Sequence, residues 1–159
     1  MKRLRTATLL LAVIAGCGEA SPEASASMLE VGTGSWRFEA VEDGEVIDLV
    51  RGAQGGWHLW VSFRITGPVE GIETIELTRQ MASEEGEPTT TVVPANFDPM
   101  DSQGRRAVVG WIEIVAEPSC KVGELMRFSA RAEGLKEGAL TDEVMIEVGA
   151  GSFPPPACE

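Results

Sequence analysis

Histidine and tyrosine are scarce in this sequence of 159 residues, which contains one histidine and no tyrosine. A nucleophilic triad places a histidine between a serine and a carboxylate, so His58 is the sole candidate base, and no G-x-S-x-G turn accompanies it. The 25 acidic residues offer no spacing that singles out a catalytic pair. We therefore expect a protein that is not an enzyme. The alternative is a small hydrolase-like enzyme that uses His58 or an acidic pair.

Basic residues are also few, since 13 Lys and Arg stand against 25 Asp and Glu, for a net charge of −12. Such a chain repels nucleic acid and anionic lipid surfaces. Clusters of metal ligands are missing as well. No histidine lies near Cys120 or Cys158, and Asp98 and Asp101 in the segment NFDPMDSQG lack the ligand spacing and the distal Glu of an EF-hand. We expect a turn at that segment, and neither a metal nor another cofactor.

A long hydrophobic run is absent too. The apolar stretch at 7–14 is far shorter than the ~20 residues that span a bilayer as a helix. Lys2, Arg3 and Arg5 precede this stretch, and small residues follow it. That order of charged, apolar and small segments is typical of a secretory signal peptide. We therefore expect an exported chain without a permanent transmembrane helix.

The residues at 14–17, IAGC, resemble the lipobox of bacterial lipoproteins. The resemblance implies that residues 1–16 are removed as a signal peptide and that Cys17 receives a diacylglycerol and becomes the acylated N-terminus. Several acyl chains on one residue bind a lipid bilayer stably, since each buried CH₂ contributes ~0.8 kcal/mol. Gly18 occupies the position where an Asp would imply retention in the inner membrane. The implied location is the outer membrane of a Gram-negative cell envelope.

Two regions follow the lipobox. Residues 17–28 are small, polar and interrupted by proline, which predicts a flexible tether with a reach of roughly 18 Å. Residues 29–159 are long enough for one domain with a hydrophobic core. Removal of the signal peptide takes away three basic residues and no acidic ones, which leaves a net charge of −15. We expect the domain to lie close to the bilayer and to be repelled by its anionic surface.

With Cys17 acylated, Cys120 and Cys158 are the two cysteines left. An exported chain enters an oxidising compartment, where a disulfide between them is the default. Closing the loop between them restricts the unfolded chain by roughly 4 kcal/mol. The disulfide would also tie the proline-rich tail FPPPACE to the body of the domain.

Short apolar and β-branched runs recur along the body, broken by Gly, Pro and Asp, and no segment shows a sustained helical stripe. The runs predict strands at 28–31, 35–41, 45–50, 57–66, 72–81, 89–93, 106–115, 124–132 and 142–148. Eight or nine strands favour an all-β antiparallel sandwich, and Asp43-Gly44 predicts a hairpin between its flanking runs. Residues 122–148, VGELMRFSARAEGLKEGALTDEVMIEV, resemble the closing hairpin of bacterial immunoglobulin-like domains. This resemblance implies an immunoglobulin-like β-sandwich.

The strand predicted at 57–66 holds the histidine and two of the four tryptophans. Its period of two places an apolar set toward the core, namely Trp57, Leu59, Val61, Phe63 and Ile65. By the same alternation, Trp36 in GSWRFEA is expected in the core. The other side carries His58, Trp60, Ser62 and Arg64, and we expect a solvated sheet face there, on which Trp60 packs across strands. The alternatives are a ligand-facing patch of His58, Trp60 and Arg64 for a carbohydrate or peptide, and a metal held by His58.

These features together predict a membrane-anchored envelope lipoprotein, similar to the small envelope lipoproteins of Gram-negative bacteria. Its sandwich is expected to be a non-enzymatic module that supports the cell surface or binds an envelope protein or polysaccharide. The enzyme alternative predicts a concave pocket in which His58 faces a buried carboxylate.

Overall fold

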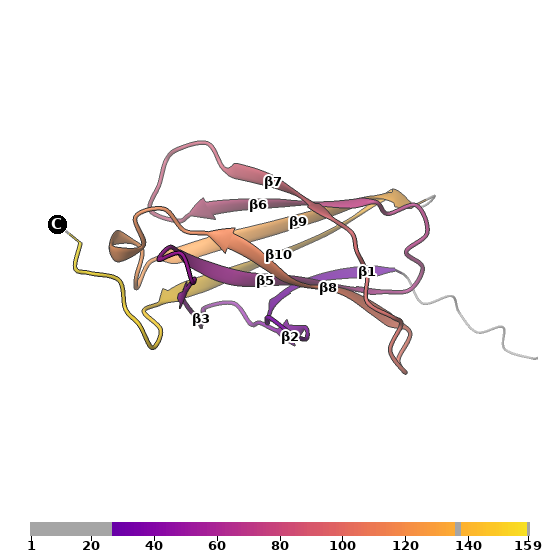
Figure 1. Ribbon diagram of the computed structural model, residues 1–159. Helices are drawn as coiled ribbons and strands as arrows, with labels where there is room; N and C mark the ends of the chain where they lie inside the picture. Colours follow the sequence, from indigo (N-terminus) through magenta and orange to yellow (C-terminus); the bar gives the residue numbers. More distant parts are fainter. Residues whose placement is uncertain (1–26, 136–137, 159) are drawn as a thin grey trace, which may run out of the picture.

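The computed structural model describes residues 27–135 and 138–158, which form two packed β-sheets (Figure 1). The strands are Met28–Thr33 (β1), Glu39–Ala40 (β2), Glu45–Asp48 (β3), Val50–Arg51 (β4), Trp57–Thr66 (β5), Thr74–Met81 (β6), Thr89–Pro94 (β7), Arg105–Ile114 (β8), Leu125–Leu135 (β9) and Gly138–Gly149 (β10), with a 3-10 turn at Pro118–Cys120. The prediction of an all-β sandwich is confirmed. The predicted signal peptide and most of the predicted tether lie outside the described residues.

The strands pair in the order of a Greek-key sandwich. Sheet A has the order β2-β1-β5-β4, with β8 along the opposite edge of β5, and sheet B has the order β3-β10-β9-β6-β7. The chain changes sheets after β2, β3, β5, β7 and β8. The last three of these changes follow the connectivity of an immunoglobulin-like domain. The pair of β3 and β10 is parallel, whereas the other pairs of the described strands are antiparallel. This parallel pair corrects the purely antiparallel arrangement that the sequence predicts.

The predicted strands lie within a few residues of the observed ones, except in the region before β5. The run 45–50 divides at Leu49, which is buried in the core, so that β3 joins sheet B and β4 joins sheet A. The run 35–41 contributes only β2. Gly34 explains this difference, because its φ of 109° turns the chain out of the direction of β1. A Cβ at Gly34 would collide with the backbone oxygen of Arg37, so the turn requires glycine.

The turn predicted at Asp43-Gly44 forms, but the hairpin does not. β2 pairs with β1, and β3 pairs with β10 in the other sheet, so the strands that flank the turn separate. The Asp43 carboxylate accepts a hydrogen bond from the Met145 amide at 2.9 Å, and the Gly44 amide donates to the Met145 carbonyl at 2.7 Å. The turn is therefore held by β10. An Asp-Gly pair specifies a local reversal of the chain, whereas contacts far along the sequence decide which sheet each strand joins.

The core lies between the sheets and is built from the inward faces of the long strands. On the inward face of β5 the buried side chains are Leu59, Val61, Phe63 and Ile65, each at most 1% exposed. This burial confirms the apolar face predicted for the strand. Trp57, expected on the same face, is only partly buried at the edge of the core. Its indole N–H donates to the carbonyl of Phe153 in the C-terminal tail at 3.1 Å.

A disulfide joins Cys120, in the 3-10 turn, to Cys158 in the tail, with their Cα atoms 4.9 Å apart. This is the pairing that the cysteine count predicts. Together with the hydrogen bond from Trp57, it holds the tail at the end of the sandwich where β5 begins. Met28 pairs with Thr66 at the other end of β5. The start of β1 and the C-terminal tail therefore lie at opposite ends of the sandwich (Figure 1).

Candidate functional site

The outer face of β5 carries the predicted ligand-facing residues, and part of this face is covered. His58 is 8% exposed and Ser62 is fully buried, so the prediction of a solvated face is wrong at these two positions. The segment 34–38 covers Ser62 after it leaves β1, whereas Gly52, which follows β4, lies beside the ring of His58. The Ser62 hydroxyl donates to the carbonyl of Gly34 at 2.9 Å and accepts a hydrogen bond from the amide of Gly110 on β8 at 3.1 Å. These two bonds join the segment to β5 and β8.

His58 packs against Trp60, with the two rings edge to face and their centroids 4.7 Å apart. Burial lowers the pKa of His58, which favours the neutral imidazole at neutral pH. Within the described residues, its buried Nε2 atom has no hydrogen-bond partner. No group of three His, Cys, Asp or Glu that would hold a metal ion occurs in that part of the chain either. The enzyme alternative and a metal held by His58 stay predictions that these contacts do not test.

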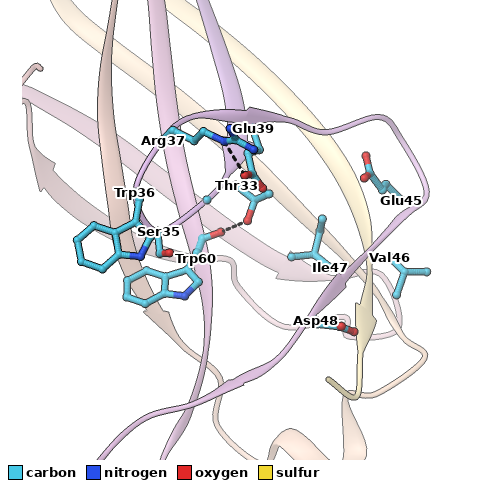
Figure 2. Close-up of a pocket in the computed structure, with 11 residues that line it drawn as sticks. Thr33, Ser35, Trp36, Arg37, Glu39, Glu45, Val46, Ile47, Asp48 and Trp60 are labelled. Atoms are coloured by element: carbon cyan, nitrogen blue, oxygen red, sulfur yellow. Dashed lines mark hydrogen bonds and ion pairs between the residues drawn. The ribbon is translucent and has the colours of Figure 1, made fainter. Parts of the chain in front are cut away.

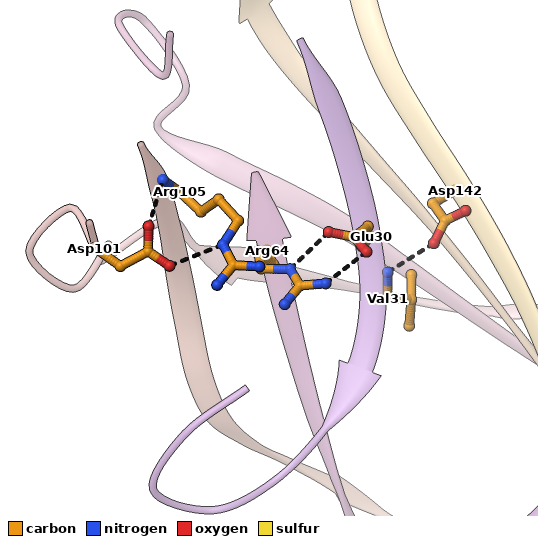
Figure 3. Close-up of polar contacts among 6 residues, drawn as sticks. All are labelled: Glu30, Val31, Arg64, Asp101, Arg105 and Asp142. Carbon is orange, nitrogen blue, oxygen red and sulfur yellow. Dashed lines mark hydrogen bonds and ion pairs between the residues drawn. The ribbon is translucent and has the colours of Figure 1, made fainter. Parts of the chain in front are cut away.

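Arg64 is bound by other residues of the domain. Its Nε and Nη2 atoms donate to the Glu30 carboxylate on β1 at 2.6 and 2.7 Å (Figure 3), and its guanidinium lies 4.2 Å from the centroid of the Phe38 ring. The hydrogen bonds from Arg64 lower the pKa of Glu30, and those same bonds raise the pKa of Arg64. Arg64 thus links β5, β1 and the segment 34–38, and its charge is matched by that of Glu30.

Trp36 lies in solvent and not in the core, so the prediction for this residue is wrong. Its side chain is 93% exposed. The reason is the turn at Gly34, after which strand alternation no longer decides which side chains face the core. Phe38, from the same segment, folds onto the sheet above Gly32 and Arg64. The segment therefore turns one aromatic ring toward the sheet and the other toward solvent.

Trp36 and Trp60 line an open groove of about 660 Å³ on the side of the sandwich. The other lining residues are Thr33, Gly34, Ser35, Arg37, Glu39, Glu45, Val46, Ile47 and Asp48. Figure 2 shows the two indoles close together at one side of the groove and the residues of β3 at the other side. Of the three residues in the predicted patch, Trp60 lines this groove, whereas His58 and Arg64 do not. Trp36, which was not predicted as a site residue, lines the groove together with Trp60.

Three carboxylates lie in the groove beside a single guanidinium. Arg37 donates to one oxygen of Glu39 at 3.1 Å (Figure 2). One oxygen of Glu45 accepts a hydrogen bond from a backbone amide at 3.0 Å, and one oxygen of Asp48 accepts another at 3.2 Å. Because a carboxylate offers about four acceptor positions, each of these groups keeps acceptor capacity. The groove as a whole is negatively charged.

The segment that contains Asp98 and Asp101 forms a turn, as predicted. One oxygen of Asp101 accepts hydrogen bonds from the amides of Gln103 and Arg105 at 2.8 and 2.9 Å, and the other accepts one from Arg105 Nε at 2.8 Å (Figure 3). The backbone hydrogen bond from Arg105 is the main cause of the lowered pKa of Asp101. The Asp101 carboxylate thus stabilises the turn.

One buried carboxylate lies between the two sheets. Glu113 on β8 is 6% exposed, and Arg79 on β6 approaches it with Nε 2.6 Å from a carboxylate oxygen. Burial raises the pKa of Glu113, and the positive charge of Arg79 only partly opposes this effect. This ion pair links sheet A to sheet B at the side of the core where β8 lies. It is located between the sheets and away from the groove.

We expect the stability of the domain to fall as pH rises through the pKa of Glu113. This pKa lies above its ordinary value of 4.5, so stability is highest while the group is protonated and is lost as it ionises. Urea unfolding of the wild type and of Glu113→Gln, from about pH 4 to about pH 7, measures this effect. The free energy of unfolding of the wild type should decline relative to that of the variant as pH increases. A difference that stays constant over this range contradicts the assignment.

Sequence reasoning missed Trp36 as a site residue because it assigned the whole run 35–41 to one strand. A signal was present in the preceding VGTGS, whose Gly32 and Gly34 interrupt the β-branched pattern. The second glycine marks the point where the chain leaves the sheet. The local sequence does not determine the directions in which the rings of Trp36 and Phe38 point.

None of the helical segments in the described part of the chain is long and apolar enough to cross a membrane. Comparison of the chain with protein-family models finds no match, and comparison with the curated proteins finds none either. The groove lined by Trp36 and Trp60 is thus the feature from which we infer a function.

Proposed function

We propose that this protein is a lipid-anchored envelope lipoprotein whose sandwich is a non-enzymatic binding module, with its binding site in the groove of Trp36 and Trp60. The observation that carries the proposal is the 93% exposure of Trp36 beside the half-buried Trp60. A tryptophan commonly buries ~150–250 Å² in a folded protein, and this one leaves almost all of its surface in water. Exposed aromatic surface with a polar rim is typical of an interaction site.

The lipobox at 14–17 supports the anchor, and the position of the groove suits an anchored protein. Thr66 lies at the end of β5, where β1 begins. Trp60 lies earlier on the same strand, about 20 Å from Thr66 at ~3.3 Å per residue. A tether at 17–28 would add a reach of roughly 18 Å. An anchored domain would therefore hold the groove away from the headgroups, where an envelope component reaches it. The net negative charge opposes contact of the domain with anionic lipid.

Cys17→Ser should abolish lipid attachment and leave an uncleaved precursor or a soluble form. The physical reason is that serine lacks the thiol on which the thioether would form. Metabolic labelling with a fatty-acid analogue, together with detergent phase partitioning, measures the effect in cells. Labelling and partitioning equal to those of the wild type would refute the lipoprotein assignment.

Trp36→Ala should weaken retention of the lipidated protein on envelope fragments from which lipid has been extracted with detergent, so that the acyl chains contribute no binding, while the melting temperature changes little because the side chain is exposed. The matched control is Phe153→Ala, which removes a 68% exposed aromatic ring outside the groove. Co-sedimentation of each purified protein with envelope fragments measures retention. Equal retention of the wild type and Trp36→Ala would refute the groove as the binding site.

A further inference from the structure

We propose that the groove binds a glycan without net negative charge, a neutral or amine-bearing polysaccharide whose sugar rings stack on Trp36 and Trp60. This inference rests on the proposed function and specifies the ligand class of the same site. It follows from three properties of the groove: its two chemically different sides, its charge, and the fixed position of the backbone that carries its aromatic rings.

The two sides of the groove match the two surfaces of a sugar ring. Trp36 and Trp60 form an aromatic side, and β3, which carries Glu45 and Asp48, lies at the other side of the groove (Figure 2). A pyranose ring has a face of polarised C–H groups and a rim of hydroxyls. The negative face of an indole attracts the C–H groups, and carboxylates with free acceptor positions bind hydroxyl donors. A site of this kind holds the ring by its face and by its rim at once.

The charge of the groove selects among glycans. Glu39, Glu45 and Asp48 bring three negative charges, and the one guanidinium of the groove, on Arg37, already binds Glu39. A carboxylate or sulfate on the ligand would meet like charges and would be repelled by them. An amine on the ligand gains from the same charges and from the aromatic faces. The groove thus favours neutral and amine-bearing sugars over anionic ones.

The segment that carries Trp36 is fixed to the sheet, and Trp60 belongs to the central strand of sheet A. The Thr33 hydroxyl donates to the Trp60 carbonyl at 2.8 Å, and Ser62 holds the carbonyl of Gly34. Phe38 covers Arg64 on the other flank of the segment. The backbone that carries the two indoles therefore has its position before a ligand arrives, which lowers the entropy lost on binding.

A titration of the lipidated full-length protein with soluble oligosaccharides tests the inference. The protein is kept in a detergent that contains no sugar, and the probes are gluco-oligosaccharides, chito-oligosaccharides with free amines, and oligosaccharides of uronic acids. Calorimetry and tryptophan fluorescence measure the affinity. Binding of a neutral or amine-bearing probe should weaken about tenfold or more in Trp36→Ala and in Trp60→Ala, each tenfold corresponding to about 1.4 kcal/mol.

Ile114→Ala is the matched control for a glycan confined to the groove. Ile114 is 68% exposed on the same face of sheet A, where it pairs with His58 on β5, but it does not line the groove. Its replacement should leave glycan affinity unchanged. If Ile114→Ala weakens retention on envelope fragments as much as Trp36→Ala does, a broad protein interface is indicated, and the glycan assignment is overturned.

The remaining outcomes separate this inference from the proposed function. Preferential binding of the uronic acid probe overturns the charge argument and leaves the groove as the binding site. Absence of binding to all three probes, with envelope retention still dependent on Trp36, overturns the glycan class alone. Loss of dependence on Trp36 in both measurements overturns the binding site and the inference together.

Discussion

Phe63→Ala should lower the free energy of unfolding by about 3–5 kcal/mol, the usual cost of removing a large aromatic side chain from a packed core. Phe63 is 0% exposed and lies on the central strand of sheet A, between the paired strands β1 and β8. Alanine leaves a cavity there that the surrounding strands cannot close, because they are fixed by their ladders of hydrogen bonds. Urea unfolding, followed by circular dichroism, measures the change.

Other aromatic positions provide the comparison for Phe63. Trp36→Ala should change stability by at most ~0.5 kcal/mol, because its side chain is 93% exposed. Trp57→Ala should fall between the two, since Trp57 is half-buried and loses its hydrogen bond to the tail. His58→Ala should cost more than an exposed substitution, because the ring is 8% exposed and packs on Trp60. A Trp36→Ala variant as unstable as Phe63→Ala would contradict the placement of both residues.

Loss of the disulfide should lower the free energy of unfolding by roughly 4 kcal/mol, because the reduced unfolded chain regains the freedom that the loop closure removes. The bond joins residues 38 positions apart and ties the tail to the 3-10 turn. A domain of about 130 residues with a continuous core should nevertheless stay folded when reduced. Urea unfolding with and without reductant measures the difference.

A double variant, Cys120→Ser with Cys158→Ser, serves as the control for reduction. Its stability should match that of the reduced wild type, and reductant should not change it further. Non-reducing mass spectrometry of protein purified from the envelope should show the two cysteines joined. Free thiols on both residues, or equal unfolding midpoints with and without reductant, would contradict the prediction.

Local patterns in the sequence were sufficient for the strands and for the core side of β5. Alternation of apolar residues predicts Leu59, Val61, Phe63 and Ile65 as buried because side chains on a strand point to opposite faces in turn, and this burial is observed. The pairing of Cys120 with Cys158 followed from counting cysteines. The anchor at Cys17 stays a prediction, since this residue lies outside the described part of the chain.

The candidate site was only partly predictable. Trp60 was expected on the outer face of β5 and lies there, but His58 and Arg64 from the same face are taken up by contacts with Trp60, Glu30 and Phe38. These contacts join residues as far as 34 positions apart. A period of two says which face a side chain occupies and contains no information about what covers that face.

The sequence by itself determined the fold class, the extent of most strands, the apolar face of β5 and the cysteine pair, because each follows from residues close in the chain or from a simple count. The tertiary structure alone decided that Trp36 faces solvent beside Trp60 and that β3 and β4 part at Leu49. It also decided that β3 pairs in parallel with β10. The physical reason is that these features depend on the turn at Gly34 and on hydrogen bonds between strands distant in sequence, and neither is encoded in a local pattern.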